Sequence, residues 1–447
     1  MRARDELSRM MGNMKRMVLR FGGGARRIGL LCFIVSLGCV PALAQVTYSV
    51  RMEMEKPKYL LGEPIFCRFV IQNTGRSVFT FRYRTPTRGL ASEDDQEPHF
   101  LVTDARGKRL PDPGPVPCGS PQGSTVYGSV TLPPGQVHVE RWLLNQWAQF
   151  AAPGRYHVRA ERRLPLIQAD PQTGKPASKP AAFAMAIDEF NLQIERSSPT
   201  QIEQAYQPYL AAIEDPKNQH PAEAVVVLTS MPRPFFLDRL VAMADAGNRD
   251  RWDRRDVLDG MARLNTPAAW KAILNIFQNS GVGSDTGGDK GSSGREGGAL
   301  RSYAVLLLAE KGDPSFIPTL TEMLRKSQEP LRGDILRALG FFDDPGASEA
   351  LMQNLHSRQV NDRMNAILGL KNLGKKEVIP SVISALNDPE TRVRQVANFA
   401  LEGVTHHQVA ENPSQEAPER LASAWHAWWV EHAGSFSATP PKPCHDW

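Results

Sequence analysis

The sequence has few cysteines, few aromatic residues and no motif of a common catalytic site. Five of its 447 residues are cysteines, and 8% are aromatic. It contains no HExxH, GxSxG, GxxxxGKS/T, CxxC or EF-hand pattern. These absences argue against the metalloproteases, α/β-hydrolases, P-loop enzymes and calcium-binding proteins that carry such signatures. We therefore expect a protein without enzymatic activity, catalytic residues or a cofactor.

The histidines and carboxylates do not follow the spacing of metal ligands. His426 and His432 stand six residues apart, whereas two ligands on one face of a helix stand four apart. The acidic run 93–97 lacks the spaced oxygen ligands and the glycine of a known calcium loop, which favours a solvated turn. We expect no metal site.

The only long apolar run stands near the N-terminus. Residues 28–40 form a run of 13, which is shorter than the about 20 residues that an ordinary membrane span needs. Arg26 and Arg27 precede the run, and a small-x-small cleavage site ends at Ala44. The pattern predicts a signal peptide over residues 1–44, export to the periplasm or the medium, and no transmembrane span in the mature chain.

Removal of this segment changes the charge and the cysteine count. Residues 1–44 hold eight Lys or Arg and two Asp or Glu, so the mature chain keeps 45 basic and 46 acidic residues. No basic excess remains to attract nucleic acid. Cys67 and Cys118 are the candidate disulfide in an oxidising compartment, and Cys444 would stay unpaired. Retention of the segment as an anchor and lipidation at Cys39 are alternatives that we favour less.

One stretch of the sequence repeats itself at an offset of 31 residues. The offset relates three segments between residues 312 and 404, and a period of this length is typical of stacked helical repeats. Five columns of equivalent residues carry the repeat: Leu320, Leu351 and Val382; Leu324, Leu355 and Leu386; Arg332, Arg363 and Arg394; Ile335, Ala366 and Ala397; Leu339, Leu370 and Leu401.

Each unit is predicted to form two short helices joined by a turn. In the last unit, apolar residues recur at helical spacing on both sides of Asp388. A pair of helices cannot cover its own apolar face, so the units must stack into an α-solenoid. We expect Arg301, Arg332, Arg363 and Arg394, which share one place in successive units, to be structural, with a role in lining a binding groove as the alternative.

The stretch 386–402 resembles the short HEAT-like repeat shared with the phycobilin lyases. The resemblance rests on Asp388 in the turn and Arg394 six residues later, which pair structurally in HEAT repeats. A lysine and a serine replace this aspartate in the two earlier units, so the resemblance leaves Arg332 and Arg363 without the usual partner. It covers roughly half of the chain and implies a fold, with no activity carried over.

Between residues 45 and 196 the pattern changes to short strand-like runs separated by Gly and Pro. Runs of β-branched and aromatic residues, with turns such as 73–75 between them, predict an antiparallel β-sandwich. The segment 59–65, this turn and the later segment 153–158 resemble the Ig-like or fibronectin-like modules of bacterial exported proteins. The predicted strands cover residues 48–50, 66–72, 78–83, 100–102, 137–143, 156–160 and 190–194.

The rest of the chain is predicted to be helical up to a short tail. Residues 197–434 form the predicted solenoid, interrupted by a Gly- and Ser-rich segment, 279–298, that we expect to be a flexible loop. The last helix carries Leu421 and three tryptophans at helical spacing. Capping of the array is the favoured role of this face, and a carbohydrate or peptide platform is the alternative. Residues 435–447 form the tail.

These features together predict an exported scaffold. A stacked array presents a long and fairly rigid surface, which suits an extended protein or peptide partner. We therefore expect a noncatalytic protein-binding module, with no nucleic-acid partner. Two alternatives stay open. One is an enzyme whose site gathers His, Asp or Glu from both domains, and the other is inhibitor-like or adhesive binding by the β-sandwich.

Overall fold

A computed structural model describes seven stretches of the chain, which all belong to one compact unit, Gln45–Trp447. The predicted signal peptide and its cleavage after Ala44 lie outside these stretches, as do Cys39, Cys118, Cys444 and the acidic run 93–97. Export and the pairing of Cys67 with Cys118 therefore remain predictions. The described residues are 46–84, 98–113, 127–168, 180–218, 221–244, 251–279 and 292–437.

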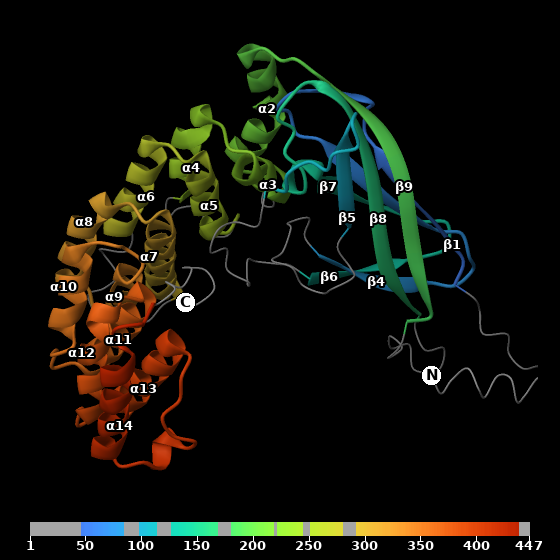
Figure 1. Ribbon diagram of the computed structural model, residues 1–447. Helices are drawn as coiled ribbons and strands as arrows, with labels where there is room; N and C mark the ends of the chain where they lie inside the picture. The colour runs from blue at the N-terminus through green and yellow to red at the C-terminus, as the bar shows by residue number, and fades with distance from the viewer. Residues whose placement is uncertain are drawn as a thin grey trace, which may run out of the picture. The chain divides into compact units, whose positions relative to one another are not determined.

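The N-terminal part folds into two β-sheets (Figure 1). All strand pairs are antiparallel except β2 with β9, which run parallel. The first sheet has the order β1 (Tyr48–Met54), β3 (Phe66–Asn73), β7 (Val137–Leu143). The second has the order β2 (Lys58–Leu60), β9 (Ala182–Glu195), β8 (Gly154–Gln168), β4 (Phe79–Arg84), β6 (Tyr127–Leu132), with β5 (His99–Asp104) paired to β8.

Alternate residues of the strands fill one apolar core shared by the two sheets. Phe69 and Ile71 of β3, Val158 of β8 and Ile194 of β9 are fully buried in it. This period of two is what places every second side chain on the same face of a strand. Cys67 belongs to this core, and burial raises the pKa of its thiol to about 12.

A buried ion pair lies inside this core. Arg162 of β8 is 1% exposed and pairs with Glu140 of β7. Its guanidinium lies 4.3 Å from the centroid of the Phe69 ring and 5.1 Å from that of Trp142. Burial alone would raise the pKa of Glu140, but the charge of Arg162 brings it below its usual value. The pair joins the two sheets through polar contacts.

Two strands escaped prediction, and two are longer than predicted. The strands β2 and β6 fall outside the predicted runs, since β6 has Gly and Ser in its first half. The strands β8 and β9 extend over 15 and 14 residues and pair along most of their length. In β8, three consecutive charged residues and Pro165 interrupt the strand-like pattern of the sequence. The predicted strand is therefore shorter than the strand in the structure.

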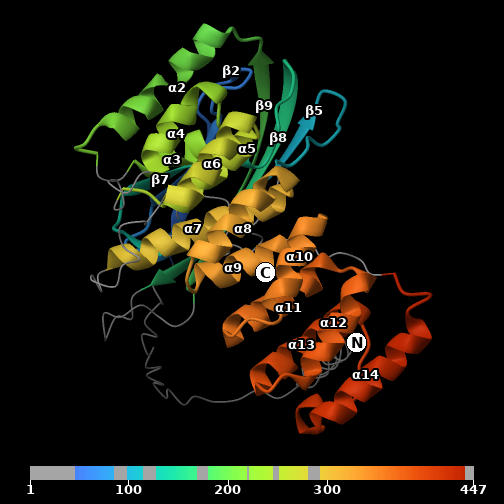
Figure 2. The same cartoon turned by 90° about the vertical axis from the view of Figure 1, so that its left-hand side faces the viewer.

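The C-terminal half is helical, with successive helices stacked against one another (Figure 2). One continuous apolar core runs through these helices as far as Trp425. The helices are α2 (Pro199–Glu214), α3 (Ala222–Ser230), α4 (Leu237–Ala244), α5 (Arg254–Leu264), α6 (Pro267–Asn279), α7 (Ser292–Lys311), α8 (Ile317–Lys326), α9 (Leu331–Leu339), α10 (Pro345–Asn354), α11 (Val360–Leu373), α12 (Ile379–Ser384), α13 (Thr391–Thr405) and α14 (Pro418–His432).

The periodic residues explain why these helices stack. Leu320 and Leu351 are fully buried on first helices, and Ala366 and Ala397 are fully buried on second helices. The small residues let neighbouring second helices approach closely. A Cβ added at Gly340, at the end of α9, would lie 2.0 Å from the carbonyl oxygen of a glycine in α11. The residues that repeat in the sequence are therefore those that form the contacts between units.

The predicted flexible loop 279–298 is wrong at its C-terminal end. The helix α7 begins at Ser292, so the last seven residues of that segment, 292–298, are helical, and residues 280–291 lie outside the described part of the chain. Glycine costs up to about 1 kcal/mol per residue in a helix, which is why composition pointed to a loop. Ala304 and Leu308, in the second half of α7, are fully buried, and their packing helps to hold the helix in the array.

Candidate functional site

Two of the arginines that recur every 31 residues, Arg332 and Arg363, bond to the next unit. In α9, the Nε of Arg332 donates to a carboxylate oxygen of Asp362 at 2.8 Å, and one Nη donates to the side chain of Asn354 at 3.0 Å. Its other Nη donates to the backbone carbonyl of Leu324, in the helix before its own. Arg332 thereby ties α8, α9 and the following unit together.

Arg363 makes the equivalent contact one unit later. Its Nε and one Nη donate to the two carboxylate oxygens of Asp388 at 2.7 and 2.8 Å. The side chains are only 12% and 10% exposed. Burial alone would raise the pKa of Asp388, but the hydrogen bonds from Arg363 and from the backbone N–H of Glu390 hold it below its usual value. This carboxylate is ionised at neutral pH.

The expectation that Arg332 and Arg363 lack an aspartate partner is therefore wrong. The resemblance left Arg332 and Arg363 without a partner because it sought an aspartate in the same unit. In the structure the aspartate comes from the next unit: Asp362 opens α11, and Asp388 stands in the turn before α13. The sequence did contain a signal for the pair of Arg332 with Asp362, because Asp362 stands directly before Arg363, the next arginine of the repeat.

The first and last arginines of the row bond to backbone oxygens. The Nε of Arg301 donates to the carbonyl of Phe277 at 3.0 Å, and the residue is 5% exposed. One Nη of Arg394 donates to the carbonyls of Asp388 and Pro389 at 2.8 and 2.9 Å. The expected pairing of Arg394 with Asp388 thus runs through the main chain, since the carboxylate is taken by the preceding unit.

A cluster of carboxyl groups lies on α5 and was not predicted. The hydroxyl of Tyr303, on α7, donates to Asp259 at 2.5 Å. Burial raises the pKa of Asp259 well above its usual value and that of Asp256 to about 7, and the neighbouring carboxylates add to both shifts. Asp253 caps the start of α5 and pairs with Arg255 at 2.6 Å. The carboxyl group of Asp256 therefore titrates near neutral pH.

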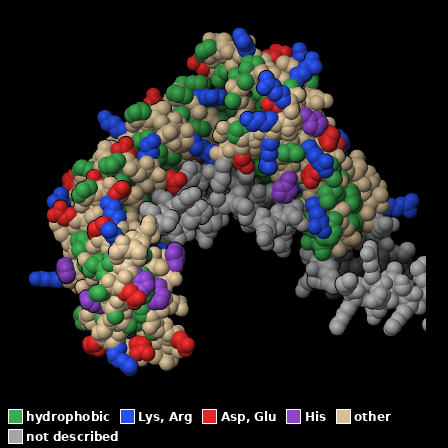
Figure 3. Space-filling model, in the orientation of Figure 1, with side chains coloured by type: hydrophobic (Ala, Val, Ile, Leu, Met, Phe, Trp, Pro, Cys, Tyr) green, Lys and Arg blue, Asp and Glu red, His purple; other side chains and the backbone are tan. Residues whose placement is uncertain are grey.

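The aromatic face of the last helix covers the end of the array. Trp425 is fully buried and its Nε1 donates to the side chain of Asn398, on α13, at 2.8 Å. The ring of Trp428 stacks on His407 at 5.0 Å and on His432 at 4.6 Å between centroids. Histidines gather over this part of the molecule (Figure 3). Of the two histidines that the sequence drew attention to, His432 thus contacts a tryptophan ring.

No metal centre is evident in the part of the chain that the structure describes. There, no three His, Cys, Asp or Glu side chains come together in a way that would hold an ion. Over the same residues, no helix combines the length and the apolar character of a membrane span.

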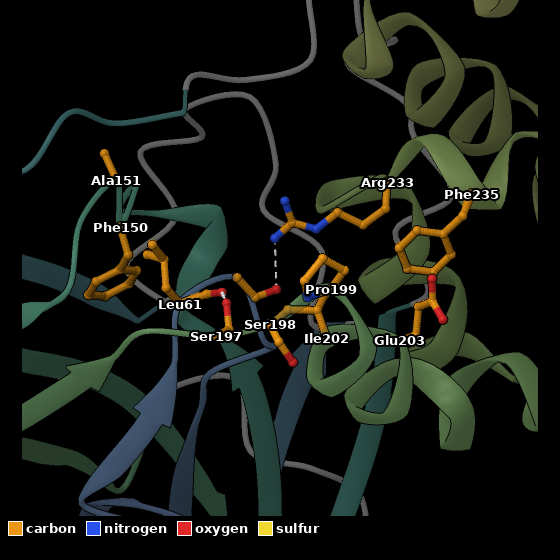
Figure 4. A pocket seen from close by; sticks show the side chains of 11 residues that line it. Leu61, Phe150, Ala151, Ser197, Ser198, Pro199, Ile202, Glu203, Arg233 and Phe235 are labelled. Carbon is orange, nitrogen blue, oxygen red and sulfur yellow. Dashed lines mark hydrogen bonds between the residues drawn. The ribbon is translucent and has the colours of Figure 1, made fainter.

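A cavity lies where the strands meet the first helices (Figure 4). Its volume is about 490 Å³. Most of its wall is apolar or uncharged, and Glu203 and Arg233 are the two ionisable residues among those that line it. The lining residues are Leu61, Gly62, Phe150, Ala151, Ser197, Ser198, Pro199, Ile202, Glu203, Arg233 and Phe235.

Arg233 is held in this cavity by a backbone carbonyl. One Nη donates to the carbonyl of Gly62 at 2.8 Å, and the hydroxyl of Tyr206 donates to the same oxygen at 3.0 Å. Gly62 has a φ of +96°, and a Cβ there would lie 2.5 Å from the arginine nitrogen. The glycine is thus required both by its backbone conformation and by the close approach of the guanidinium.

The polar contacts of Arg141 fix the strands to the helices. Arg141 of β7 binds both carboxylate oxygens of Glu55 at 2.6 and 2.9 Å and also pairs with Glu223 of α3. Its guanidinium lies 4.2 Å from the centroid of the Phe66 ring. Arg141 therefore joins β7 to α3.

Sequence reasoning missed Arg233 because its partner is 171 residues away. The local sequence indicates only that the backbone at this arginine is restricted, because Pro232 and Pro234 flank it. The turn at Gly62 was visible in the sequence, but a turn glycine alone does not identify the side chain that lies against it.

The comparisons with known proteins identify HEAT repeats in the chain. A family model described as HEAT repeats matches residues 296–364. No curated protein matches. Among solved structures, the complex of CpcE and CpcF of phycocyanin lyase from Nostoc sp. PCC7120 is similar, with 16% identity and a TM-score of 0.25 over 50% of this chain and 82% of that chain.

Two further solved structures are similar at the same low level. Spo0M, a sporulation control protein from Bacillus subtilis, has 16% identity and a TM-score of 0.17, over 37% of this chain and 54%, about half, of that chain. An engineered protein has 15% identity and a TM-score of 0.26, over 46% of this chain and 91% of that chain. These TM-scores carry no argument about activity. The match to the family model supports HEAT-like repeats in a helical C-terminal half.

Proposed function

We propose that this protein is a noncatalytic exported scaffold that binds a protein or peptide partner along its repeats. The observation that carries the proposal is the stacked helical array whose residues 296–364 match HEAT repeats. Such arrays suit extended partners because each unit places equivalent side chains at regular intervals. The proposal includes a cleaved signal peptide, location in the periplasm or outside the cell, and an Ig-like character for the β-sheet part.

A row of residues on the second helices is the best candidate for the contact surface. Arg337, Leu368 and Phe399 stand 31 residues apart and so occupy one place in three successive units. Phe399 is 56% exposed, and the ammonium of Lys371 lies 5.4 Å from the centroid of its ring. An exposed aromatic ring beside a cation is a common energetic centre of a protein interface. We call these three residues the repeat row.

The arginines that the sequence singled out play a supporting part in this proposal. Arg332 and Arg363 use their guanidinium groups in bonds between units, so they hold the spacing of the second helices on which the repeat row stands. On the face seen in Figure 3, basic and acidic side chains are interspersed. A partner that uses apolar and mixed polar contacts suits such a surface.

The enzyme alternative has less support. It called for a cavity that gathers His, Asp or Glu from both parts of the chain, and the cavity at the junction offers Glu203 with Arg233. One carboxylate beside a cation provides no acid and base pair. Binding by the β-sheet part remains the second candidate, favoured by the exposed row Phe183, Met185 and Ile187 on β9.

A capture experiment with matched variants tests the scaffold proposal. The full chain, Phe399→Glu and Val430→Glu are used as bait against an envelope extract of the source cells. Val430 is 69% exposed on α14 and lies outside the repeat row, so it controls for a new surface charge. We expect a partner that the wild type and Val430→Glu retain and Phe399→Glu loses. Equal capture by all three baits would contradict a contact at the repeat row.

A further inference from the structure

The cavity at the junction combines an apolar wall with the guanidinium of Arg233, which forms no ion pair within the described part of the chain. Among the described residues, Arg233 bonds to the Gly62 carbonyl and to no acidic side chain. The nearby carboxylate of Glu63 is paired with Lys56 at 2.9 Å. The Nε of Arg233 is buried and makes no hydrogen bond. Arg233 is half-buried, and a guanidinium with an unsatisfied buried donor favours an anion in the space beside it.

The start of α2 adds to this preference. Ser198 is the N-cap of the 16-residue helix, and Pro199 is its first residue. Both line the cavity (Figure 4). The N-terminal end of a helix carries partial positive charge, which acts in the same direction as the guanidinium. The capping box of Ser198 with Gln201 keeps this end in place.

The apolar wall limits what kind of anion fits. Leu61, Phe150, Ile202 and Phe235 line the cavity, and the guanidinium of Arg233 points toward the side of Leu61 and Phe150 (Figure 4). A volume of about 490 Å³ lies within the range of small-molecule sites. A phosphate or sulfate would leave this wall uncovered. A carboxylate attached to a short apolar body would satisfy the guanidinium and bury the wall.

We propose that this cavity is a binding site for a carboxylate on a short apolar body, with Arg233 as the residue that recognises the charge. The inference goes beyond the scaffold function, since the cavity lies away from the repeat row. A free carboxylic acid and the C-terminal carboxylate of a peptide share this chemistry. Glu203 also lines the cavity and is exposed, so its charge weakens anion binding and disfavours ligands with a second acidic group.

Two pairs of probes are used. Within each pair, an acid and its amide show how much binding depends on the charge, and the two pairs distinguish a free carboxylic acid from a peptide C-terminus. Hexanoate and hexanamide represent the free acid, and N-acetyl-leucine and its amide represent a peptide C-terminus. Each is titrated into the full chain by calorimetry up to about 10 mM, which covers the affinity expected of ligands this small. We expect at least one acid to bind and its amide to bind about tenfold more weakly or not at all.

Substitutions test whether the acid binds in this cavity and whether Arg233 recognises its charge. Arg233→Met keeps the aliphatic stem and removes the charge, so it should abolish the preference for the acid. Ala151 is exposed at the cavity, and Ala151→Trp should block binding while leaving Arg233 intact. Arg239→Met and Ala152→Trp make the same changes at exposed residues outside the cavity and should bind as the wild type does. Glu203→Gln should tighten acid binding about two- to threefold.

Three results would overturn the proposal. They are equal binding of an acid and its amide, unchanged acid binding in both Arg233→Met and Ala151→Trp, or no binding of either acid by the full chain. Far-UV circular dichroism of each variant confirms folding. If Arg233→Met unfolds, Ala151→Trp and the comparison of acid with amide on the wild type still decide the question.

Discussion

At the scale of single residues, the chain uses charged side chains to join units that are otherwise held by apolar contacts. The guanidinium of Arg363 reaches from α11 to Asp388 of the next unit, and Arg162 lies inside the β-sheet core with Glu140. Such buried groups need their partners, because removal of one leaves the other charge buried and unpaired. The Arg332 and Arg363 contacts therefore act on stability and on the spacing between units.

Replacement of Arg363 by alanine should destabilise the chain by about 2–3 kcal/mol. The carboxylate of Asp388 would lose two hydrogen bonds while staying largely buried. Arg392→Ala, at an exposed position on α13, is the matched control and should change stability by less than about 0.5 kcal/mol. Urea unfolding followed by circular dichroism measures both. Similar values for the two variants would show that the bond between units contributes little.

The carboxyl cluster on α5 predicts a dependence of stability on pH. Because burial raises the pKa of Asp256 to about 7, the folded state holds this proton more tightly than the unfolded chain does. Stability is then lost as pH rises from about 4, the pKa of an unfolded aspartate, through about 7. Asp253 and Arg255 act on this carboxyl group, and Asp259 and Tyr303 are coupled to it electrostatically.

Asp256→Asn should remove this loss. We expect the variant to be more stable than the wild type by about 1–3 kcal/mol near pH 8 and nearly equal to it near pH 4.5. Urea midpoints at the two pH values provide the test. A variant that is less stable than the wild type near pH 8 would mean that the ionised carboxylate has a favourable partner.

At the scale of elements, close packing of second helices decides which glycines can change. The carbonyl oxygen of Gly369 lies where a Cβ at Gly340 would stand, so α9 and α11 must move apart to accept a methyl group. At Gly403, on α13, the added Cβ would meet the flexible end of Lys371 instead, at 2.9 Å. The two glycines thus differ in what opposes a side chain.

Gly340→Ala should destabilise the chain by about 2–3 kcal/mol because it overfills a contact between backbones. Gly403→Ala should be neutral or stabilising by up to about 1 kcal/mol, since alanine is the better helix former and the lysine can shift. Thermal unfolding of both variants gives the comparison. Equal effects would show that α9 and α11 are not held as closely as the structure describes.

The sequence predicted the elements better than their contacts. Apolar residues such as Leu320, Leu351 and Val382 recur with the period of the fold, so the helices were visible. The partner of Arg332 was not, because Asp362 belongs to the next unit and the resemblance supplied a rule for one unit only. The burial of Arg162 also could not be predicted, since an arginine in a strand usually marks an exposed position.

At the scale of the whole molecule, the candidate sites arise from contacts between distant parts of the sequence. The cavity needs Gly62, the start of α2 and Arg233, which no local pattern links. The repeat row, in contrast, follows directly from the 31-residue period, but its exposure was unknown until the stacking was seen. Sequence periodicity thus predicts regular surfaces and gives little information on cavities where two kinds of structure meet.

The central claim is that the second helices of the repeats bind a protein partner. Hydrogen–deuterium exchange of the full chain, alone and with the partner captured by wild type, tests it most directly. We predict slower exchange on the exposed faces of α11 and α13, around Leu368 and Phe399, with little change in the strands. Protection confined to β8 and β9, with α11 and α13 unchanged, would contradict the claim and assign binding to the β-sheet part.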